Sequence, residues 1–214
     1  MSVTTPVHLH HDSPDAVGRR DRLGVILLIV ADIAFVGSLM FSYMYLRFLN
    51  TEGAWMPEGM IEAPPLIAWI VITIMVIGLV AIYLGVRGMK AGKPSSLALG
   101  AGVALIAALS SLVFEIVKMS QFNFPLSDKG YFAGGYSSTM VTLAGANAFH
   151  LVLTIVITLG ILNRARLGKY KDPASWQPRI ATYWWLWVVV SALLIGLMTT
   201  FYVTSPYLPS MVSS

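Results

Sequence analysis

Five long apolar runs divide the chain, and the short segments between them carry most of the charged residues and prolines. The runs lie near 23–46, 66–88, 97–119, 138–163 and 181–203. Each is long enough to cross roughly 30 Å of hydrocarbon as a helix of about 20 residues. None shows the alternation over about 10 residues that is typical of a membrane-barrel strand, and a spanning segment must satisfy its own backbone hydrogen bonds. The pattern predicts an all-α integral membrane protein, a single bundle of five transmembrane helices.

Composition supports this prediction. Hydrophobic residues make up 57% of the 214 residues and charged residues 11%, which is far from the balance of a typical soluble domain. The segments outside the five runs are too short for a separate soluble domain. We therefore expect an N-terminal tail over 1–22, a transmembrane bundle over 23–203 and a C-terminal tail over 204–214.

Lysine and arginine are distributed unevenly over the two sides of the predicted bundle. When successive helices alternate in direction, the side of the N-terminus receives eleven of the fourteen cations: Arg19, Arg20, Arg22, Arg87, Lys90, Lys93, Arg164, Arg166, Lys169, Lys171 and Arg179. The positive-inside rule then predicts a cytoplasmic N-terminus and an external C-terminus. The formal net charge of +4 reflects this topology and attraction to anionic headgroups, and it does not indicate nucleic-acid binding.

Aromatic and small residues suggest how the helices are anchored and packed. We interpret the aromatic residues near the helix ends as belts at the membrane interfaces, namely Trp55, Trp69, Trp176, Tyr183, Trp184, Trp185 and Trp187. Small residues in the third run predict close approach to a neighbouring helix, namely Gly100, Gly102, Ala104, Ala107 and Ala108.

Four ionisable side chains lie inside or at the edge of the runs: Asp32, Glu115, Lys118 and His150. Each is a candidate functional residue, because a charge at the bilayer centre costs at least about 2.5–3.5 kcal/mol. Glu115 and Lys118 stand three residues apart near the outer boundary, so we expect a local ion pair that reaches headgroup water by snorkelling. Asp32 and His150 lie on different helices at similar depths, roughly 14 and 20 Å from the cytoplasmic ends at 1.5 Å per residue.

Three interpretations of Asp32 and His150 are open at this point. If the two side chains face each other, the imidazole satisfies the carboxylate and fixes two helices in register or lines a lipid site. The same pair can also handle protons. Alternatively the two side chains do not meet, and Asp32 avoids the cost of a buried charge by holding a proton.

Metal chemistry is limited by the ligands that the sequence offers. The chain has no cysteine, and His150 is the one histidine within a run. A haem held by two histidines, or a copper site, needs more buried ligands than this. The other histidines, His8, His10 and His11, belong to the stretch HLHHD, which we expect to form a solvated tail. We therefore predict no metal site, no cofactor and no catalytic residue in this chain, which also lacks a phosphate-binding glycine loop and a nucleophile elbow.

Several stretches follow one another in an order and spacing that point to one family. They are VADIAFVGSLMFSYMYLR, with Asp32 at the position of a buried glutamate in the family, AWMPEGMIEAPP, VRGMKAGK, SDKGYFAGGYSSTMVTLAGANAFHLVL and NRARLGKY. The fourth stretch carries the family's motif positions at Asp128, Gly130, Tyr136, Ser137, Ser138, Gly145 and His150. From about residue 20 to its end, the chain resembles subunit III of the haem-copper (cytochrome c or quinol) oxidases, in the five-helix form of that family.

The chain departs from the family at four polar positions. A glutamate late in the third-helix motif is absent, with Ser120 near its place and Glu115 displaced. Asn147 replaces the first histidine of the fourth-helix motif. Trp185 and Val188 replace a histidine and an aspartate in the last helix, where Tyr183 and Trp184 are kept. The replacements indicate a divergent branch or a related accessory subunit.

The resemblance implies a role without redox chemistry in this chain. In such complexes subunit I holds the haems and copper and reduces dioxygen to water while pumping protons. Subunit III packs directly against subunit I, binds phospholipid in a cleft between its helices and supports proton uptake. By this resemblance Asp32, His150 and Asn147 are candidates for the lipid cleft or the proton-uptake side, with Glu115 and Lys118 as a second polar pair. The expected partners are subunits I and II, and the expected location is a prokaryotic cytoplasmic membrane.

Two other functions fit parts of the sequence. A subunit III-like accessory protein of a nitric oxide reductase shares the five-helix layout. A small proton-coupled transporter would use Asp32, Glu115, Lys118 and His150 as relay groups, although the runs show no internal repeat or break of the kind that transporters have. The sequence leaves the electron donor of an oxidase, cytochrome c or quinol, undecided.

Overall fold

Five long α-helices form the bundle. The structure is a computed structural model, and it describes residues 13–50, 53–56, 62–122, 124, 134–172 and 175–206. The helices are α1 (Pro14–Leu49), α2 (Pro65–Lys90), α3 (Pro94–Ser120), α4 (Gly135–Arg166) and α5 (Gln177–Phe201). Each is long and apolar enough to cross a membrane, which indicates the multi-pass, all-helical membrane protein that the sequence predicts. The stretch HLHHD, Asp128 and Gly130 lie outside the described residues.

Helix α1 begins earlier than the apolar pattern predicts, at Pro14 rather than near 23, so part of the predicted tail is helical. The side-chain oxygen of Ser13 accepts a hydrogen bond from the Ala16 amide at 3.3 Å and caps the helix. A proline in the first turn loses no intrahelical hydrogen bond. The cluster Arg19–Arg22 therefore lies on the helix itself.

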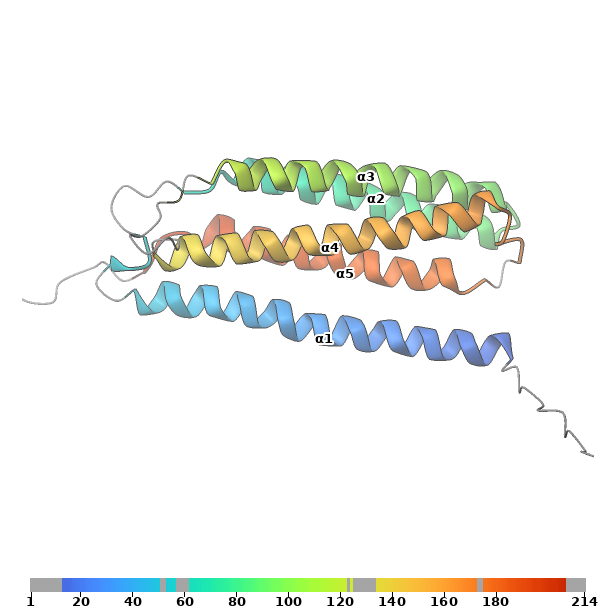
Figure 1. The fold of residues 1–214 in the computed structure, drawn as a ribbon, viewed down its shortest axis with the longest axis horizontal. Helices are drawn as coiled ribbons and strands as arrows, with labels where there is room; N and C mark the ends of the chain where they lie inside the picture. Colours follow the sequence, from blue (N-terminus) through green and yellow to red (C-terminus); the bar gives the residue numbers. More distant parts are fainter. Residues whose placement is uncertain are drawn as a thin grey trace, which may run out of the picture.

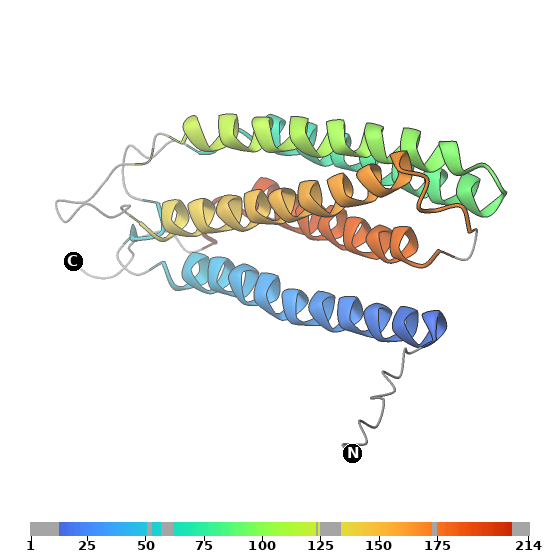
Figure 2. The same ribbon diagram turned by 45° about the vertical axis from the view of Figure 1, so that its right-hand side comes forward.

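The helices α4 and α5 occupy the centre of the bundle. Helix α2 packs against α3 and α5, α3 packs against α4, and α4 packs against α5, so that α2 to α5 form a closed four-helix unit. Helix α1 lies on the far side of α4 and α5 from α2 and α3 (Figure 1), and the described residues show no contact between α1 and either of those two helices. Figure 2 shows α1 leaning away from α4 and α5 toward its own N-terminus.

The two ends of the bundle differ in charge. The end with the start of α1 and the connections α2–α3 and α4–α5 carries the eleven cations named above, and we call it the basic end. At the opposite end, the first residues of α4 meet the segment that follows α1, where the amides of Gly135 and Tyr136 donate to the carbonyls of Ala54 and Trp55 at 2.9 Å.

Small residues bring α2 and α3 into close contact. A Cβ atom on Gly100 would lie 2.9 Å from the Cα of Gly85, so only glycine fits at this crossing. Ala104 and Ala108 are fully buried along the same helix. The predicted packing role is confirmed at these positions. Gly102 differs, since nothing lies within 4 Å of a Cβ built there.

Aromatic and basic side chains fasten the C-terminal half of α1 at the opposite end. The rings of Tyr43 and Trp55 meet edge to face with centroids 4.9 Å apart. The indole Nε1 of Trp55 donates to the Val203 carbonyl at 2.7 Å, and Arg47 Nε donates to the Thr204 carbonyl at 2.7 Å. Trp55 is only 2% exposed, so the interpretation of this residue as an interface anchor is wrong. Its buried N–H needs a partner, and the backbone after α5 provides one.

Replacing Gly100 with leucine tests the α2–α3 contact. We expect Gly100→Leu to destabilise the bundle, because overpacking a tight site costs about 1–3 kcal/mol. Gly102→Leu is the matched control, and it is expected to change the melting temperature little because its Cβ meets open space. Thermal unfolding in detergent measures both variants. Equal melting temperatures for Gly100→Leu and Gly102→Leu would contradict this account of the crossing.

Candidate functional site

The carboxylate of Asp32 joins three helices in the apolar part of the bundle. The Nε2 atom of His150 on α4 lies 3.1 Å from Oδ1 and 3.0 Å from Oδ2 of Asp32. The indole Nε1 of Trp187 on α5 donates to Oδ2 at 2.5 Å. The His150 side chain is fully buried, and that of Asp32 is 14% exposed. The structure thus brings Asp32 and His150 together and adds Trp187 as a third member.

The position of Asp32 follows from a stripe along α1. Ile29, Asp32, Val36 and Tyr43 recur at spacings of three, four and seven residues, so they share one face of the helix. Val36 and Tyr43 are buried, Ile29 packs against the central core, and Asp32 lies between them. The other faces of α1 are also apolar and exposed, as a lipid-facing surface requires. Hydropathy alone therefore cannot distinguish the packed face of this helix.

The donors around Asp32 suit a carboxylate. An indole N–H can only donate, so Oδ2 acts as an acceptor toward Trp187. His150 in its Nε2–H form supplies a second donor to the same group. Among the described residues, the buried Nδ1 atom of His150 has no hydrogen-bond partner.

A ladder of hydroxyl groups continues from His150 along α4. Thr154 donates to the His150 carbonyl at 2.7 Å, and Thr158 donates to the Thr154 carbonyl at 2.6 Å. The indole N–H groups of Trp184 and Trp185 donate to these two hydroxyls, at 3.0 and 2.9 Å. Both tryptophans are buried. Their interpretation as an interface belt is wrong, because their N–H groups find partners inside the bundle and hold α5 against α4.

A second polar cluster links α3 to α4. Lys118 Nζ lies 2.5 Å from Glu115 Oε1, which confirms the predicted local ion pair. Asn147 Nδ2 on α4 donates to Glu115 Oε2 at 3.0 Å. Glu115 is fully buried and Lys118 is 8% exposed, so the pair does not reach headgroup water by snorkelling as predicted. The pair faces the bundle interior instead, where Asn147 satisfies the second carboxylate oxygen.

A small cavity borders this second cluster. It measures about 20 Å³ and lies among α2, α3, α4 and α5, with Glu115, Lys118, Asn147 and Thr199 in its wall. The buried Oδ1 of Asn147 has no hydrogen-bond partner among the described residues. A cavity of roughly 10–15 Å³ or more with polar walls can hold one water molecule. The cluster therefore has space for a water that would complete the hydrogen bonds of Asn147.

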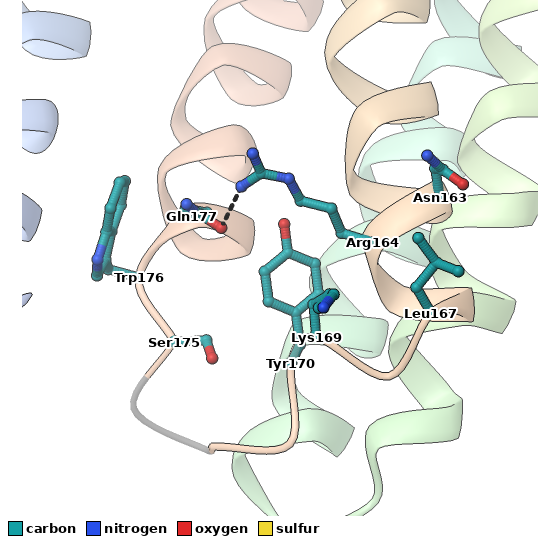
Figure 3. Close-up of a pocket in the computed structure, with 8 residues that line it drawn as sticks. All are labelled: Asn163, Arg164, Leu167, Lys169, Tyr170, Ser175, Trp176 and Gln177. Carbon is teal, nitrogen blue, oxygen red and sulfur yellow. Dashed lines mark hydrogen bonds between the residues drawn. The ribbon is translucent and has the colours of Figure 1, made fainter.

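The α4–α5 connection encloses a separate hollow of about 500 Å³ at the basic end (Figure 3). Arg164 Nη1 donates to Gln177 Oε1 at 2.9 Å across the hollow. The Tyr170 side chain lies beside Arg164, and burial raises the pKa of its phenol. Asp32 and His150 are not in its wall. The hollow is thus distinct from the Asp32 site.

Trp187 is the residue of this site that sequence reasoning missed. The aromatic pattern at the start of the last helix predicts an interface position for Trp187, although it lies one turn farther in than Tyr183. The depth of Trp187 inside the apolar run is the sequence feature that could have identified it, because an indole N–H at that depth must find an acceptor within the protein. An intramembrane carboxylate is the acceptor to look for.

Substitutions at Asp32 test whether its carboxylate stabilises the packing of α1 against α4 and α5. We expect Asp32→Ala to lower the free energy of unfolding in detergent by about 1–3 kcal/mol, because it leaves buried donors without an acceptor. Asp32→Asn keeps an oxygen that can accept from Trp187, so we expect a smaller decrease in its free energy of unfolding. Ser38→Ala, at an exposed position on the same helix, serves as the control. Wild-type stability of Asp32→Ala would be inconsistent with this role.

Substitutions in the second cluster test a buried ion pair. Glu115→Gln leaves the Lys118 ammonium without its counter-ion, and breaking a buried pair in this way costs about 3–5 kcal/mol. Removing both charges in Glu115→Gln/Lys118→Met is expected to restore most of the stability. Unfolding of the single and double variants in detergent provides the comparison. If the double variant is no more stable than the single one, the two charges do not compensate each other.

Helix α4 contributes a residue to each of the two polar clusters, His150 to the first and Asn147 to the second. Comparisons with models of known protein families and with curated proteins found no match to this chain. Any function is therefore argued from the sequence resemblance and from the geometry of these side chains.

Proposed function

We propose that the chain is an accessory, non-redox subunit III of a respiratory haem-copper terminal oxidase. The position and the contacts of Asp32 are the main support for the proposal. Its place in VADIAFVGSLMFSYMYLR resembles that of the family's buried acid, and in the bundle it is bonded to His150, which also occupies a family motif position. A membrane-embedded acid that is satisfied by two other helices fits a subunit that supports a neighbouring enzyme by positioning helices and lipid.

The proposed orientation puts the basic end in the cytoplasm. Eleven of the fourteen cations lie at this end, and cytoplasmic segments of membrane proteins carry an excess of lysine and arginine. The C-terminus is then external, and the membrane is the prokaryotic cytoplasmic membrane. Asp32 lies ten residues beyond Arg22, which places it roughly 15 Å deeper at 1.5 Å per residue.

A groove beside Asp32 supports the proposed lipid-binding role. It measures about 490 Å³ and separates the N-terminal half of α1 from α4 and α5. Val25 and Leu28 of α1 face Ile157 and Ile161 of α4 across it, and its wall is mostly apolar. Asp32 holds α1 to α4 one turn beyond Leu28, the last residue of α1 in the wall of the groove. An acyl chain of a phospholipid suits such a wall, and subunits I and II are the proposed protein partners.

The replacements in α5 support one second candidate, the subunit III-like protein of a nitric oxide reductase. Trp185 and Val188 stand where the oxidase family has a histidine and an aspartate, and both are fully buried in the central core. Their packing leaves no polar group of the expected kind at either position. A proton-coupled transporter is less well supported, because each of the five described helices is continuous, whereas transporter sites are built from broken helices.

Isolation of the intact complex tests the proposal. The tagged chain, purified in mild detergent from its native membrane, is expected to bring with it haem-containing subunits that consume oxygen. Consumption of nitric oxide instead of oxygen would favour the second candidate. A haem-free oligomer of this chain alone would contradict both.

The Asp32→Ala variant of that complex gives a second prediction. We expect this variant complex to keep its haem spectrum. Its turnover and its content of bound phospholipid should decline faster than those of the wild type, because α1 is less firmly held. The Ser38→Ala complex is the control on the same helix. Unchanged lipid content and turnover in Asp32→Ala would remove Asp32 from the proposed supporting role.

A further inference from the structure

The hollow within the α4–α5 connection has a wall that is rich in hydrogen-bond donors (Figure 3). It measures about 500 Å³, and the Arg164 guanidinium and the Lys169 ammonium belong to its wall. None of the described residues in the wall carries a carboxylate. Gln177 accepts from Arg164 through Oε1 at 2.9 Å, so its amide nitrogen remains as a further donor. A ligand that fits this wall must supply hydrogen-bond acceptors and negative charge.

The Tyr170 hydroxyl is a buried donor in the same wall. Tyr170 is only 4% exposed, and its hydroxyl forms no hydrogen bond with the described residues. Figure 3 shows this hydroxyl directed toward Arg164 and Gln177. Burial raises the pKa of the phenol, so it keeps its proton at neutral pH and can donate it to an acceptor. Because the Arg164 side chain is exposed, it can turn toward a ligand and admit an acceptor to this hydroxyl.

A tight turn at the end of α4 brings these side chains to one place. Gly168 has a φ of 65°, in the left-handed region that glycine favours after a helix. The amides of Gly168 and Lys169 donate to the carbonyls of Ala165 and Arg164 at 3.0 Å. The turn returns the chain so that Tyr170 lies beside Arg164 (Figure 3). It also engages two of the last carbonyls of α4, whose partial negative charge opposes the binding of an anion.

The start of α5 contributes a positive dipole across the hollow from Arg164. Gln177 is the first residue of α5, and no side chain forms a capping hydrogen bond at this end of the helix. The N-terminus of a helix carries a partial positive charge and attracts anions, phosphate in particular. The side-chain donors of α4 and its following turn thus face the N-terminus of a second helix.

A phosphate monoester matches this set of donors. It carries a charge of about −1.5 to −2 at pH 7, which two side-chain cations balance. The Arg164 guanidinium suits bidentate hydrogen bonds with phosphate oxygens, and the Lys169 ammonium acts as a point charge. Sites for small organic molecules measure about 300–1,000 Å³, so the hollow also has space for an organic group against Leu167 and Trp176.

The place of the hollow favours a ligand from the aqueous phase. The described residues of its wall all come from 163–177, which comprise the end of α4, the connection and the start of α5. Arg164 and Lys169 are both exposed. A soluble ligand therefore reaches the site at the basic end without passing through the apolar part of the bundle.

We propose that the hollow formed by Arg164, Lys169, Tyr170 and the start of α5 binds the phosphate group of a soluble phosphate monoester. The bound ligand joins the end of α4 to the start of α5. The inference goes beyond the proposed function and does not depend on it, because the wall belongs to this chain alone and binding is measured without turnover.

Equilibrium dialysis tests the inference on the complete chain, purified in mild detergent with the subunits that accompany it. The probes are radiolabelled inorganic phosphate and phenyl phosphate at physiological ionic strength. We expect one saturable site per chain, which binds phenyl phosphate more tightly because the ring contacts the apolar part of the wall. Tyr170→Phe removes only the hydroxyl, and Arg164→Gln removes the guanidinium. Each is expected to weaken binding by about ten-fold, as the loss of a hydrogen bond to a charged group does.

Arg166→Gln is the matched control, because it removes the same charge two residues away, from a side chain that lines a different hollow. It is expected to bind both probes like the wild type. Arg164→Lys keeps the charge but loses the bidentate fork, so intermediate affinity is expected. The melting temperature of each variant shows whether a loss of binding reflects unfolding, and Tyr170→Phe is expected to melt like the wild type.

Three results would overturn the inference. Equal losses in Arg164→Gln and Arg166→Gln would mean that the basic end attracts anions without a defined site. Wild-type affinity in Tyr170→Phe would remove the buried hydroxyl from the site. Displacement of phenyl phosphate by phosphatidic acid in mixed micelles, at lower concentration than by unlabelled phenyl phosphate, would assign the hollow to a lipid headgroup. The haem content and oxygen consumption of the complex are measured separately, so failure of this inference and failure of the proposed function are distinguishable.

Discussion

The cost of placing a carboxylate in the apolar part of a membrane protein governs the position of α1. Asp32 meets that cost with two N–H donors from two other helices, His150 Nε2 on α4 and Trp187 Nε1 on α5. Of the other four described helices, α1 contacts only α4 and α5. The carboxylate is therefore a directional contact on a helix whose remaining contacts are apolar packing and attachments near its ends. Moving α1 along its axis or turning it would leave three polar groups without partners.

The contacts of α1 change along its length. At the opposite end, Tyr43, Trp55 and Arg47 bind the backbone that follows α5 and close the bundle tightly. In the middle, the Asp32 cluster holds α1 to α4 and α5. Toward the basic end, the apolar groove and a second pocket, which Arg19, Arg22 and Arg179 line, flank α1. The contact of Gly18 with Trp176 joins α1 to the start of α5 there. The bundle is thus closely packed at one end of α1 and hollowed at the other.

Much of the fold was predictable from the sequence, because a membrane span needs both length and continuous apolar character. The helix ends were less predictable, and the start of α1 at Pro14 depended on a serine cap and a proline rather than on hydropathy. The similar depths of Asp32 and His150 made their contact one of three open interpretations, and the structure shows that the two side chains meet. Which face of a helix is packed could not be read from the sequence, because lipid and core are equally apolar. The same ambiguity hid Trp187, and it made Lys118 look like a snorkelling residue although it points inward.

Asn147 shows how a replacement can keep a polar contact. It stands where the family resemblance would place a histidine, and its amide donates to Glu115 on α3. The fourth helix thus carries both polar clusters, His150 toward α1 and α5, and Asn147 toward α3. The bundle holds its helices in register with these few buried polar groups, while small residues and tryptophans fill the space between them.

A double-mutant cycle on Asp32→Ala and Trp187→Phe tests the central claim most directly. Unfolding of the wild type, both single variants and the double variant in the same detergent gives the coupling energy between the two side chains. If Asp32 fastens α1 to α5 through Trp187, the second substitution costs less once the first is present, with a coupling of about 0.5–3 kcal/mol. Additive effects, equal within about 0.3–0.5 kcal/mol, would show that the two residues act independently and would contradict the account.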